Sequence, residues 1–183
     1  MPIQTPICDF GQKAHDFKLK STEGKILSLA DVKGEKGTLI MFICNHCPYV
    51  KAVIKDIVND ANNLKNLKVN TIAIMSNDTK NYPDDSFENM IKFSKRNKFN
   101  FPYLLDETQE TAKKYGAVCT PDFFGYNRDL ELQYRGRIRE LKDLKPVSVG
   151  ESDLLNAMKM IAETGKGPQN QIPSMGCNIK WFK

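Results

Sequence analysis

The sequence predicts an α/β domain in which helices flank a mixed central sheet. Buried strands alternate with amphipathic helices along most of the chain, and a closing pair of strands and a helix follow them. With 183 residues, 40% of them hydrophobic, the chain can bury one sizeable core. We therefore expect one domain over residues 1–163. Residues 164–183 are rich in Gly, Pro, Asn and Gln but end in an apolar cluster, so we expect an extended C-terminal arm that folds back on the domain or onto a partner subunit.

The first half of the domain predicts a hairpin, a strand and a helix, in that order. Alternating apolar and polar residues on both sides of residues 21–24 indicate an N-terminal hairpin. Residues 38–43 form an unbroken apolar run, which is typical of a central strand covered on both faces. From Val50 to Leu64, just after Pro48, apolar residues recur with a period of about 3.6, which predicts a helix with one buried face.

The second half continues this alternation. Residues 71–75 predict a second buried strand, followed by a polar loop. Asp85 and Glu88 have the spacing of a capping box, so we expect a helix to begin at Asp85 and to end near Asn97. The other predicted elements are a strand over 101–105, a short helix capped by Asp106 and Gln109 that ends at Gly116, strands over 122–126 and 130–138, and a helix over 154–162. Three alternating arginines predict a solvated face at the end of the last strand: Arg135, Arg137 and Arg139.

Composition argues against several classes of protein. The net charge of +5 is mild and only five residues are arginines, so we expect no binding of nucleic acid. The longest apolar run, residues 39–44, is far shorter than the roughly 20 residues of a membrane span. The N-terminal sequence lacks the pattern of a signal peptide. We therefore expect a cytoplasmic protein that does not associate with membranes.

Five cysteines are odd in number and too few for a disulfide scaffold, which favours redox or metal chemistry. Two of them stand in the sequence Cys44-Asn45-His46-Cys47, where a buried strand meets the first turn of a helix. The helix dipole and the free N–H groups there stabilise a thiolate. Asn45 is a candidate N-cap, and a protonated His46 would favour the thiolate further. Residues three apart on a turn can form and break a disulfide bond, so the motif predicts a redox-active dithiol.

Two other interpretations of this motif stay open. Cys44 and Cys47 can be structural residues, because free cysteine is often a small core side chain. They can also ligate zinc or an iron-sulfur cluster, although two more ligands are then needed and no second Cys-x-x-Cys is present. The side chains that could complete such a site are Cys8, Cys119, Cys177 and His15. We expect no metal and no cofactor.

The order of strand, Cys-x-x-Cys helix, strand, helix, Thr120-Pro121 and strand resembles the thioredoxin fold. In that fold a cis-proline loop packs against the disulfide and pairs with the backbone of the substrate. The resemblance implies that Thr120 and Pro121 lie beside Cys44 and Cys47 and position the substrate.

Further motifs narrow the resemblance. They are Phe17-Lys-Leu, the hairpin exit Gly24-Lys-Ile-Leu-Ser-Leu-Ala-Asp, a long central insertion before Thr120, Phe101-Pro-Tyr-Leu-Leu-Asp106 and Lys114-Tyr-Gly116. Over residues 10–163 the chain resembles the redoxin branch, which includes alkyl hydroperoxide reductase/thiol-specific antioxidant proteins and thiol-disulfide oxidoreductases. The stretches 44–50, 119–124 and 176–181 are similar to a group of peroxiredoxin-like proteins of the thioredoxin family.

The chain departs from peroxiredoxins in one respect. Peroxiredoxins carry Thr or Ser three residues before the peroxidatic cysteine, and Cys44 stands in that place if Cys47 is the peroxidatic residue. Two further cysteines are candidates for a third thiol, namely Cys119 beside the Thr-Pro loop and Cys177 on the arm. The alternatives are a buried filler for Cys119 and a tethering or surface role for Cys177.

We therefore expect a thiol-disulfide oxidoreductase in which Cys44 attacks a substrate disulfide and Cys47 resolves the mixed disulfide. The alternatives are a peroxiredoxin-like thiol peroxidase with an antioxidant role and a non-catalytic module that senses redox state or holds a metal. The expected partners are a protein or small-molecule disulfide or peroxide and an external thiol reductant. We expect a monomer or a homodimer.

Overall fold

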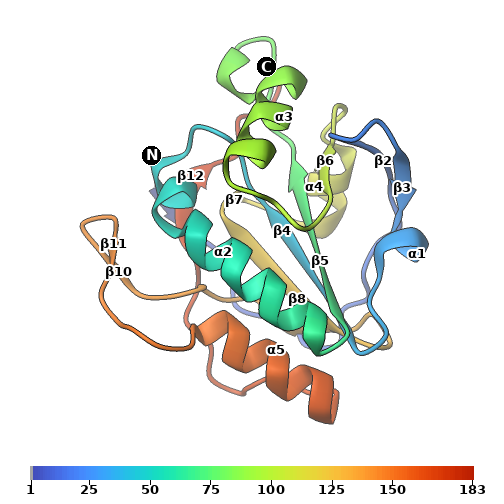
Figure 1. Cartoon of the computed structure of the whole chain (residues 1–183), viewed down its shortest axis with the longest axis vertical. Coiled ribbons are helices and arrows are strands. Elements are labelled where there is room, and N and C mark those ends of the chain that lie inside the picture. The colour runs from blue at the N-terminus through green and yellow to red at the C-terminus, as the bar shows by residue number, and fades with distance from the viewer. Residues whose placement is uncertain (1) are drawn as a thin grey trace.

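A computed structural model describes residues 2–183. Its main sheet has seven strands and lies between two layers of helices (Figure 1). The strand order is β3-β2-β6-β5-β4-β8-β9. The strands are β2 (Lys18–Ser21), β3 (Ile26–Ser28), β4 (Gly37–Phe42), β5 (Val69–Met75), β6 (Tyr103–Leu105), β8 (Asp122–Asn127) and β9 (Leu132–Tyr134). The helices are α1 (Leu29–Val32), α2 (Pro48–Asn66), α3 (Phe87–Arg96), α4 (Glu110–Tyr115) and α5 (Asp153–Thr164).

The sheet is mixed, as the sequence predicts. Strand β4 pairs in parallel with β5 and antiparallel with β8. All six residues of β4 are buried, and their side chains alternate between two cores. Leu39 and Met41 face the core under α2 and α5, whereas Ile40 and Phe42 face the core that includes residues of α1 and α4. The continuous apolar run of β4 therefore reflects burial on both faces.

Helix α2 begins at Pro48 and follows β4 after a five-residue loop. Proline is tolerated at the first helical position because its missing N–H would have no partner within the helix. The apolar residues with helical spacing form the buried face: Val50, Val53, Ile54, Ile57, Ala61 and Leu64. This strand-loop-helix unit, which the sequence predicts, places the Cys-x-x-Cys motif at the carboxyl edge of the sheet.

Several local predictions are wrong, beginning with a helix cap and a solvated face. Asp85 does not cap α3, because the N-cap is Ser86, whose side chain accepts the Asn89 N–H, and Asp85 ends a 3-10 turn at Pro83–Asp85. The arginines near β9 do not form a solvated face. Arg135 and Arg139 are each only 8% exposed.

Those two arginines pair with carboxylates brought to them by other elements. Arg135 bonds the buried Asp122 carboxylate of β8 at 2.9 Å, and Arg139 bonds Asp56 of α2 at 3.2 Å. A buried charge needs such a partner, and strand alternation alone cannot reveal it. β9 is also shorter than the strand predicted over 130–138, since regular pairing ends at Tyr134.

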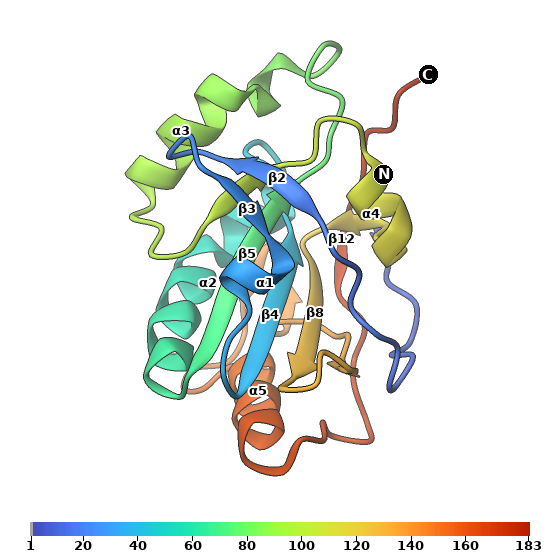
Figure 2. The same ribbon diagram turned by 90° about the vertical axis from the view of Figure 1, so that its right-hand side faces the viewer.

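The C-terminal arm, residues 164–183, runs from α5 back along the domain to the opposite end of the molecule (Figure 2). Its strand β12 (Met175–Asn178) lies between β1 (Pro2–Gln4) and β7 (Cys119–Thr120) in a second, three-stranded sheet. The two-residue strands β10 (Leu141–Lys142) and β11 (Lys145–Pro146) form a separate hairpin. Among residues 2–183, no helix is long and apolar enough to cross a membrane.

Candidate active site

The two cysteines of the motif lie between the end of β4 and the start of α2. Cys47 is the N-cap of α2, and Cys44 follows β4 by two residues. The N-cap is therefore Cys47 and not Asn45, the predicted candidate. At this position the free N–H groups and the positive end of the helix dipole act on the Cys47 sulfur.

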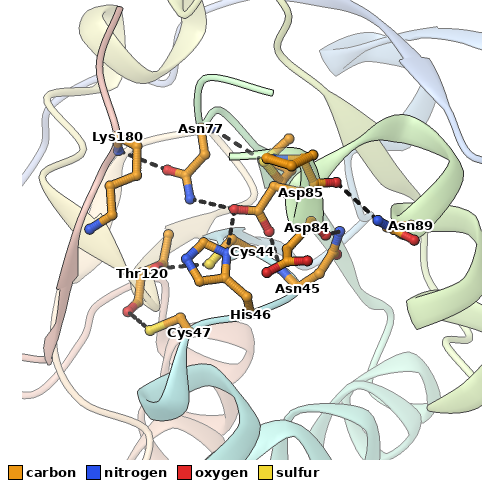
Figure 3. A network of polar contacts seen from close by, with 12 residues as sticks. Cys44, Asn45, His46, Cys47, Asn77, Asp84, Asp85, Asn89, Thr120 and Lys180 are labelled. Carbon is orange, nitrogen blue, oxygen red and sulfur yellow. Dashed lines mark hydrogen bonds and ion pairs between the residues drawn. The ribbon is translucent and has the colours of Figure 1, made fainter. Parts of the chain in front are cut away.

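Both sulfurs contact Thr120, which precedes a cis proline (Figure 3). The Cys44 Sγ lies 3.5 Å from Thr120 Oγ1, and the Cys47 Sγ lies 3.2 Å from the Thr120 carbonyl oxygen. The Thr120-Pro121 peptide bond is cis. The structure thus brings together Cys44, Cys47, Thr120 and Pro121, although 73 residues separate Cys47 from Thr120 in the chain.

The two thiols have opposite electrostatic environments. The pKa of Cys47 is lowered to about 4, first by a hydrogen bond from Cys44 and also by a bond from the Val50 N–H. The pKa of Cys44 is raised well above its usual range because it keeps its proton in the bond to Cys47, is buried, and lies near the Asp85 carboxylate. The direction of these two shifts favours the ionised form at Cys47 and the protonated form at Cys44.

Asp85 organises the loop that carries the motif. Its carboxylate is fully buried and accepts the Asn45 N–H at 2.8 Å and the Asn77 side-chain amide at 2.9 Å (Figure 3). Asn45 also accepts the Tyr103 hydroxyl at 2.7 Å and donates to the Asp84 carbonyl at 3.1 Å. These bonds fix the backbone between the two cysteines, and the sequence offers no spacing that would have identified Asp85, Asn77 or Tyr103.

The His46 side chain points away from helix α2 and toward the Asp85 carboxylate. Its Nδ1 lies 2.6 Å from Asp85 Oδ2, which is within ion-pair distance but outside the alignment of a hydrogen bond. Its ring stacks on Tyr82 at 6.4 Å between centroids. A proton on His46 would therefore lie next to the buried Asp85 carboxylate, whose negative charge offsets part of the effect of that proton on the thiols.

One group in residues 2–183 has the donor types of a metal site. The ligand atoms of Cys44, His46 and Asp85 lie within 4.8 Å of one another. The Asp85 oxygens already accept hydrogen bonds from Asn45 and Asn77, and a zinc site needs a fourth ligand. The four other candidate ligands, Cys8, Cys119, Cys177 and His15, do not join this group.

The other cysteines differ in their access to the dithiol. Cys119 is fully buried, and its thiol donates to the Pro121 carbonyl at 3.5 Å. Burial raises the pKa of Cys119, and raises that of Cys8 to about 11. Cys177 lies on β12 opposite Thr120, packed against the core that contains both motif cysteines.

Little of the dithiol is open to solvent. Cys44 is 1% exposed and Cys47 is 0% exposed. A cavity of about 260 Å³ opens beside Pro121, between Tyr49 and Val53 of α2 and Ser174 and Met175 of the arm. Access to the sulfurs themselves is limited by the elements around them.

The model of the AhpC/TSA family matches residues 10–141. The chain belongs to the AhpC/TSA family. The expected membership of the redoxin branch is thereby confirmed. Sporulation thiol-disulfide oxidoreductase A of Bacillus subtilis is 27% identical over 119 residues, which cover 64% of this chain and 67% of that protein.

Solved structures of other proteins are similar over most of this AhpC/TSA chain. An uncharacterized conserved protein from Geobacillus kaustophilus is 41% identical with a TM-score of 0.94, and the match covers 100% of this chain and 97% of that one. The thioredoxin domain of a thiol-disulfide oxidoreductase from Bacteroides vulgatus is 18% identical with a TM-score of 0.59, over 69% and 86% of the two chains. The predicted thioredoxin-like fold is confirmed.

Proposed function

We propose that this AhpC/TSA protein is a thiol-disulfide oxidoreductase whose redox couple is Cys44 and Cys47. The observation that carries the proposal is the meeting of two thiols of opposite acidity at a helix N-terminus and against one residue, Thr120. Such a pair can attack a disulfide and then close on itself. The activity named for the Bacillus subtilis relative supports the same chemistry.

In this proposal Cys47 attacks and Cys44 resolves, the reverse of the order expected from the sequence. The Cys47 thiolate attacks one substrate sulfur, a mixed disulfide forms, and the other substrate sulfur leaves as a thiolate that takes up a proton. Cys44 then loses its proton, attacks the Cys47 sulfur and releases the second substrate thiol. The substrate gains two electrons and the protein holds a Cys44–Cys47 disulfide.

The raised pKa of Cys44 does not block the second step. Its largest cause is the hydrogen bond that Cys44 gives to the Cys47 thiolate. That bond ends when Cys47 enters the mixed disulfide, so the pKa of Cys44 falls when Cys44 is needed as a nucleophile. A ring nitrogen of His46 lies within 4.8 Å of the Cys44 sulfur, a separation that one bridging water can span to carry this proton.

An external thiol reductant restores the dithiol, and a reducing compartment such as the cytoplasm suits a protein of this kind. Substrates are disulfides of proteins or small molecules. The cavity beside Pro121 offers an apolar surface from α2 next to the cis-proline loop for part of such a substrate.

The proposal is tested by reduction of insulin with dithiothreitol as donor. We expect Cys47→Ser to abolish catalysis and Cys44→Ser to lower the rate by at least about 10²-fold, within the range seen when a catalytic group is removed. Cys8→Ser is the matched control, because Cys8 is a half-buried cysteine outside the motif, and it should keep the full rate. Turnover that persists in Cys47→Ser would contradict the proposal.

A second candidate function is reduction of hydroperoxides. Family membership and the lowered pKa of Cys47 favour it, since a thiolate attacks peroxide and the sulfenic acid condenses with a neighbouring thiol. Cys44 in place of the usual hydroxyl residue argues against a specialised peroxidase. Consumption of hydrogen peroxide in the same variants, without insulin reduction, would favour this second function.

A further inference from the structure

The C-terminal strand lies directly on the cis-proline loop. β12 pairs antiparallel with β7, and the register places Cys177 opposite Thr120 and Asn178 opposite Cys119. The preceding residue, Gly176, approaches the loop so closely that a Cβ there would lie 2.1 Å from the Thr120 carbonyl oxygen. Only glycine therefore permits this seating of the strand, and β7 has no free edge on that side.

The register also directs Cys177 toward the dithiol. Directly opposed residues of an antiparallel pair present their side chains on the same face, about 4.5 to 5.5 Å apart at Cβ. The Thr120 side chain on that face contacts the Cys44 sulfur, and the Thr120 carbonyl contacts Cys47. Cys177 accordingly packs against the core that holds both cysteines.

The electrostatics agree with this placement. Proximity of Cys177 is among the causes that lower the pKa of Cys47, and burial, followed by the interaction with Cys47, raises the pKa of Cys177 to about 11. In the reduced protein Cys177 therefore lies close enough to the Cys47 sulfur to favour its ionised form.

The arm is also coupled to the loop that carries the motif. The Lys180 N–H donates to the Asn77 side chain at 2.9 Å, and Asn77 donates to Asp85, which holds Asn45 (Figure 3). Gln109 bonds the Lys180 carbonyl at 2.9 Å. A continuous set of hydrogen bonds thus joins the end of the arm to the residues between the two cysteines.

An edge strand beside a reactive thiol is a site where an extended peptide can add as a further strand. Such a peptide would present a cysteine to Cys47 if that cysteine stood opposite Thr120. Cys177 occupies this register position in the chain itself. The arm therefore occupies the position on β7 that a peptide substrate would take, and it covers the sulfurs of Cys44 and Cys47.

We propose that β12 is an internal occupant of the peptide-binding edge of β7 and that Cys177 is a third redox thiol, able to form a disulfide with Cys47. This inference rests on the proposed function, since it requires that Cys47 attacks disulfides. Attack by Cys47 on a disulfide gives a mixed disulfide and releases one thiol. The Cys177 thiolate then attacks the Cys47 sulfur, the second thiol leaves with a proton, and a Cys47–Cys177 bond remains.

The Cys47–Cys177 disulfide is the oxidised product of this exchange, because the two thiols have given two electrons to the substrate disulfide. Cys44 can next attack Cys47, which transfers the bond to Cys44–Cys47 and returns Cys177 as a thiol. No further oxidant is consumed in this exchange. The arm would be tethered over the site in the first state and free to leave β7 in the second.

The cross-link is tested in Cys44→Ser protein treated with glutathione disulfide and mapped by mass spectrometry of its peptides. We expect a bond between Cys47 and Cys177 and no retained glutathione. The matched control, Cys44→Ser with Cys177→Ser, should keep glutathione on Cys47. Retention of glutathione on Cys47 in Cys44→Ser alone, or a bond to Cys119 instead, would overturn the role of Cys177 while leaving Cys47 as the attacking thiol. Absence of any attack at Cys47 in both variants would contradict the proposed function itself.

Coverage by the strand is tested with Gly176→Ala, whose methyl group cannot lie beside the Thr120 carbonyl. We expect iodoacetamide to alkylate Cys47 about tenfold faster or more, which corresponds to destabilising the docked strand by at least 1.4 kcal/mol. Gln169→Ala, an exposed position on the same arm outside β12 and outside the cavity lining, is the control and should keep the original rate. An unchanged rate in Gly176→Ala would overturn the covering role of the strand.

Discussion

Asp85 shows how one buried side chain sets the chemistry of its neighbours. Its carboxylate fixes the backbone at Asn45, meets the His46 ring and opposes ionisation of Cys44. The interaction between the two thiols is the largest cause that separates their pKa values, and burial followed by the Asp85 charge raises that of Cys44 further. A residue 38 positions beyond Cys47 therefore contributes to the difference in acidity between the two cysteines.

The acidity of Cys47 gives a prediction at this scale. An ordinary thiol gains reactivity about tenfold per pH unit below its pKa near 8.5, because only the thiolate reacts. With a pKa of about 4, Cys47 is already ionised, so its alkylation rate should stay nearly constant between pH 5 and 8. Peptide mapping after brief treatment with iodoacetamide should find Cys47 labelled before Cys44. Preferential labelling of Cys44, or a tenfold rise in the alkylation rate of Cys47 per pH unit, would favour Cys44 as the attacking thiol and Cys47 as the resolving one.

Helix α2 connects the site to the rest of the fold. Its N-terminus acts on Cys47, and its far half packs against α5. There the buried Asp60 carboxylate accepts a hydrogen bond from Ser152, the N-cap of α5. Burial raises the pKa of Asp60 to about 6, so the native state holds this proton more tightly than the unfolded chain.

Asp60→Asn should therefore stabilise the protein at neutral pH. A native pKa above the unfolded value means that the cost of ionising Asp60 appears as pH rises from about 4 to 6 and is fully present at pH 7. The shift of about two pKa units corresponds to about 3 kcal/mol at most, and the amide of the variant can still accept the Ser152 hydroxyl. Urea unfolding at pH 4 and pH 7 measures the difference. A variant no more stable than the parent at pH 7 would show that the ionised carboxylate is adequately stabilised.

The fold of the whole molecule brings the cysteines of three distant segments into one region. Cys44 and Cys47 come from the first βα unit, Thr120 from β7, and Cys177 from the arm that returns along the domain. The two cores on either side of the sheet hold these segments in fixed positions. Because the native fold stabilises one sulfur as a thiolate, the global stability of the reduced protein is linked to the charge of that sulfur.

This linkage is measurable as a pH dependence of unfolding. The native pKa of Cys47, about 4, lies below its unfolded value, so its contribution is fully present above about pH 9 and is lost as pH falls toward 4. The free energy of unfolding of the reduced protein, minus that of Cys47→Ser, should rise by at most about 4 kcal/mol between pH 4 and pH 7. Cys8→Ser should show no such slope, because the pKa of Cys8 is raised to about 11. A difference independent of pH would mean that Cys47 is protonated in the native state.

Local patterns alone determined much of this architecture. Continuous apolar character predicted β4 because both of its faces are buried, and helical periodicity predicted α2 because only one of its faces is. Cys44 and Cys47 were identifiable because their spacing coincides with the junction of these two elements. Each of these signals is contained in one short, continuous stretch of sequence.

Tertiary structure alone decided which residues surround the sulfurs. The local pattern predicts a helix cap at Asp85, a solvated Arg135 and, for Cys177, either a third thiol or a tethering or surface role. All three gain their partners from distant segments. Such contacts depend on strand order and register, which no local periodicity encodes. The acidity of Cys47 and the seating of the arm on β7 follow from those long-range contacts, because electrostatic and packing forces act through space and not along the sequence.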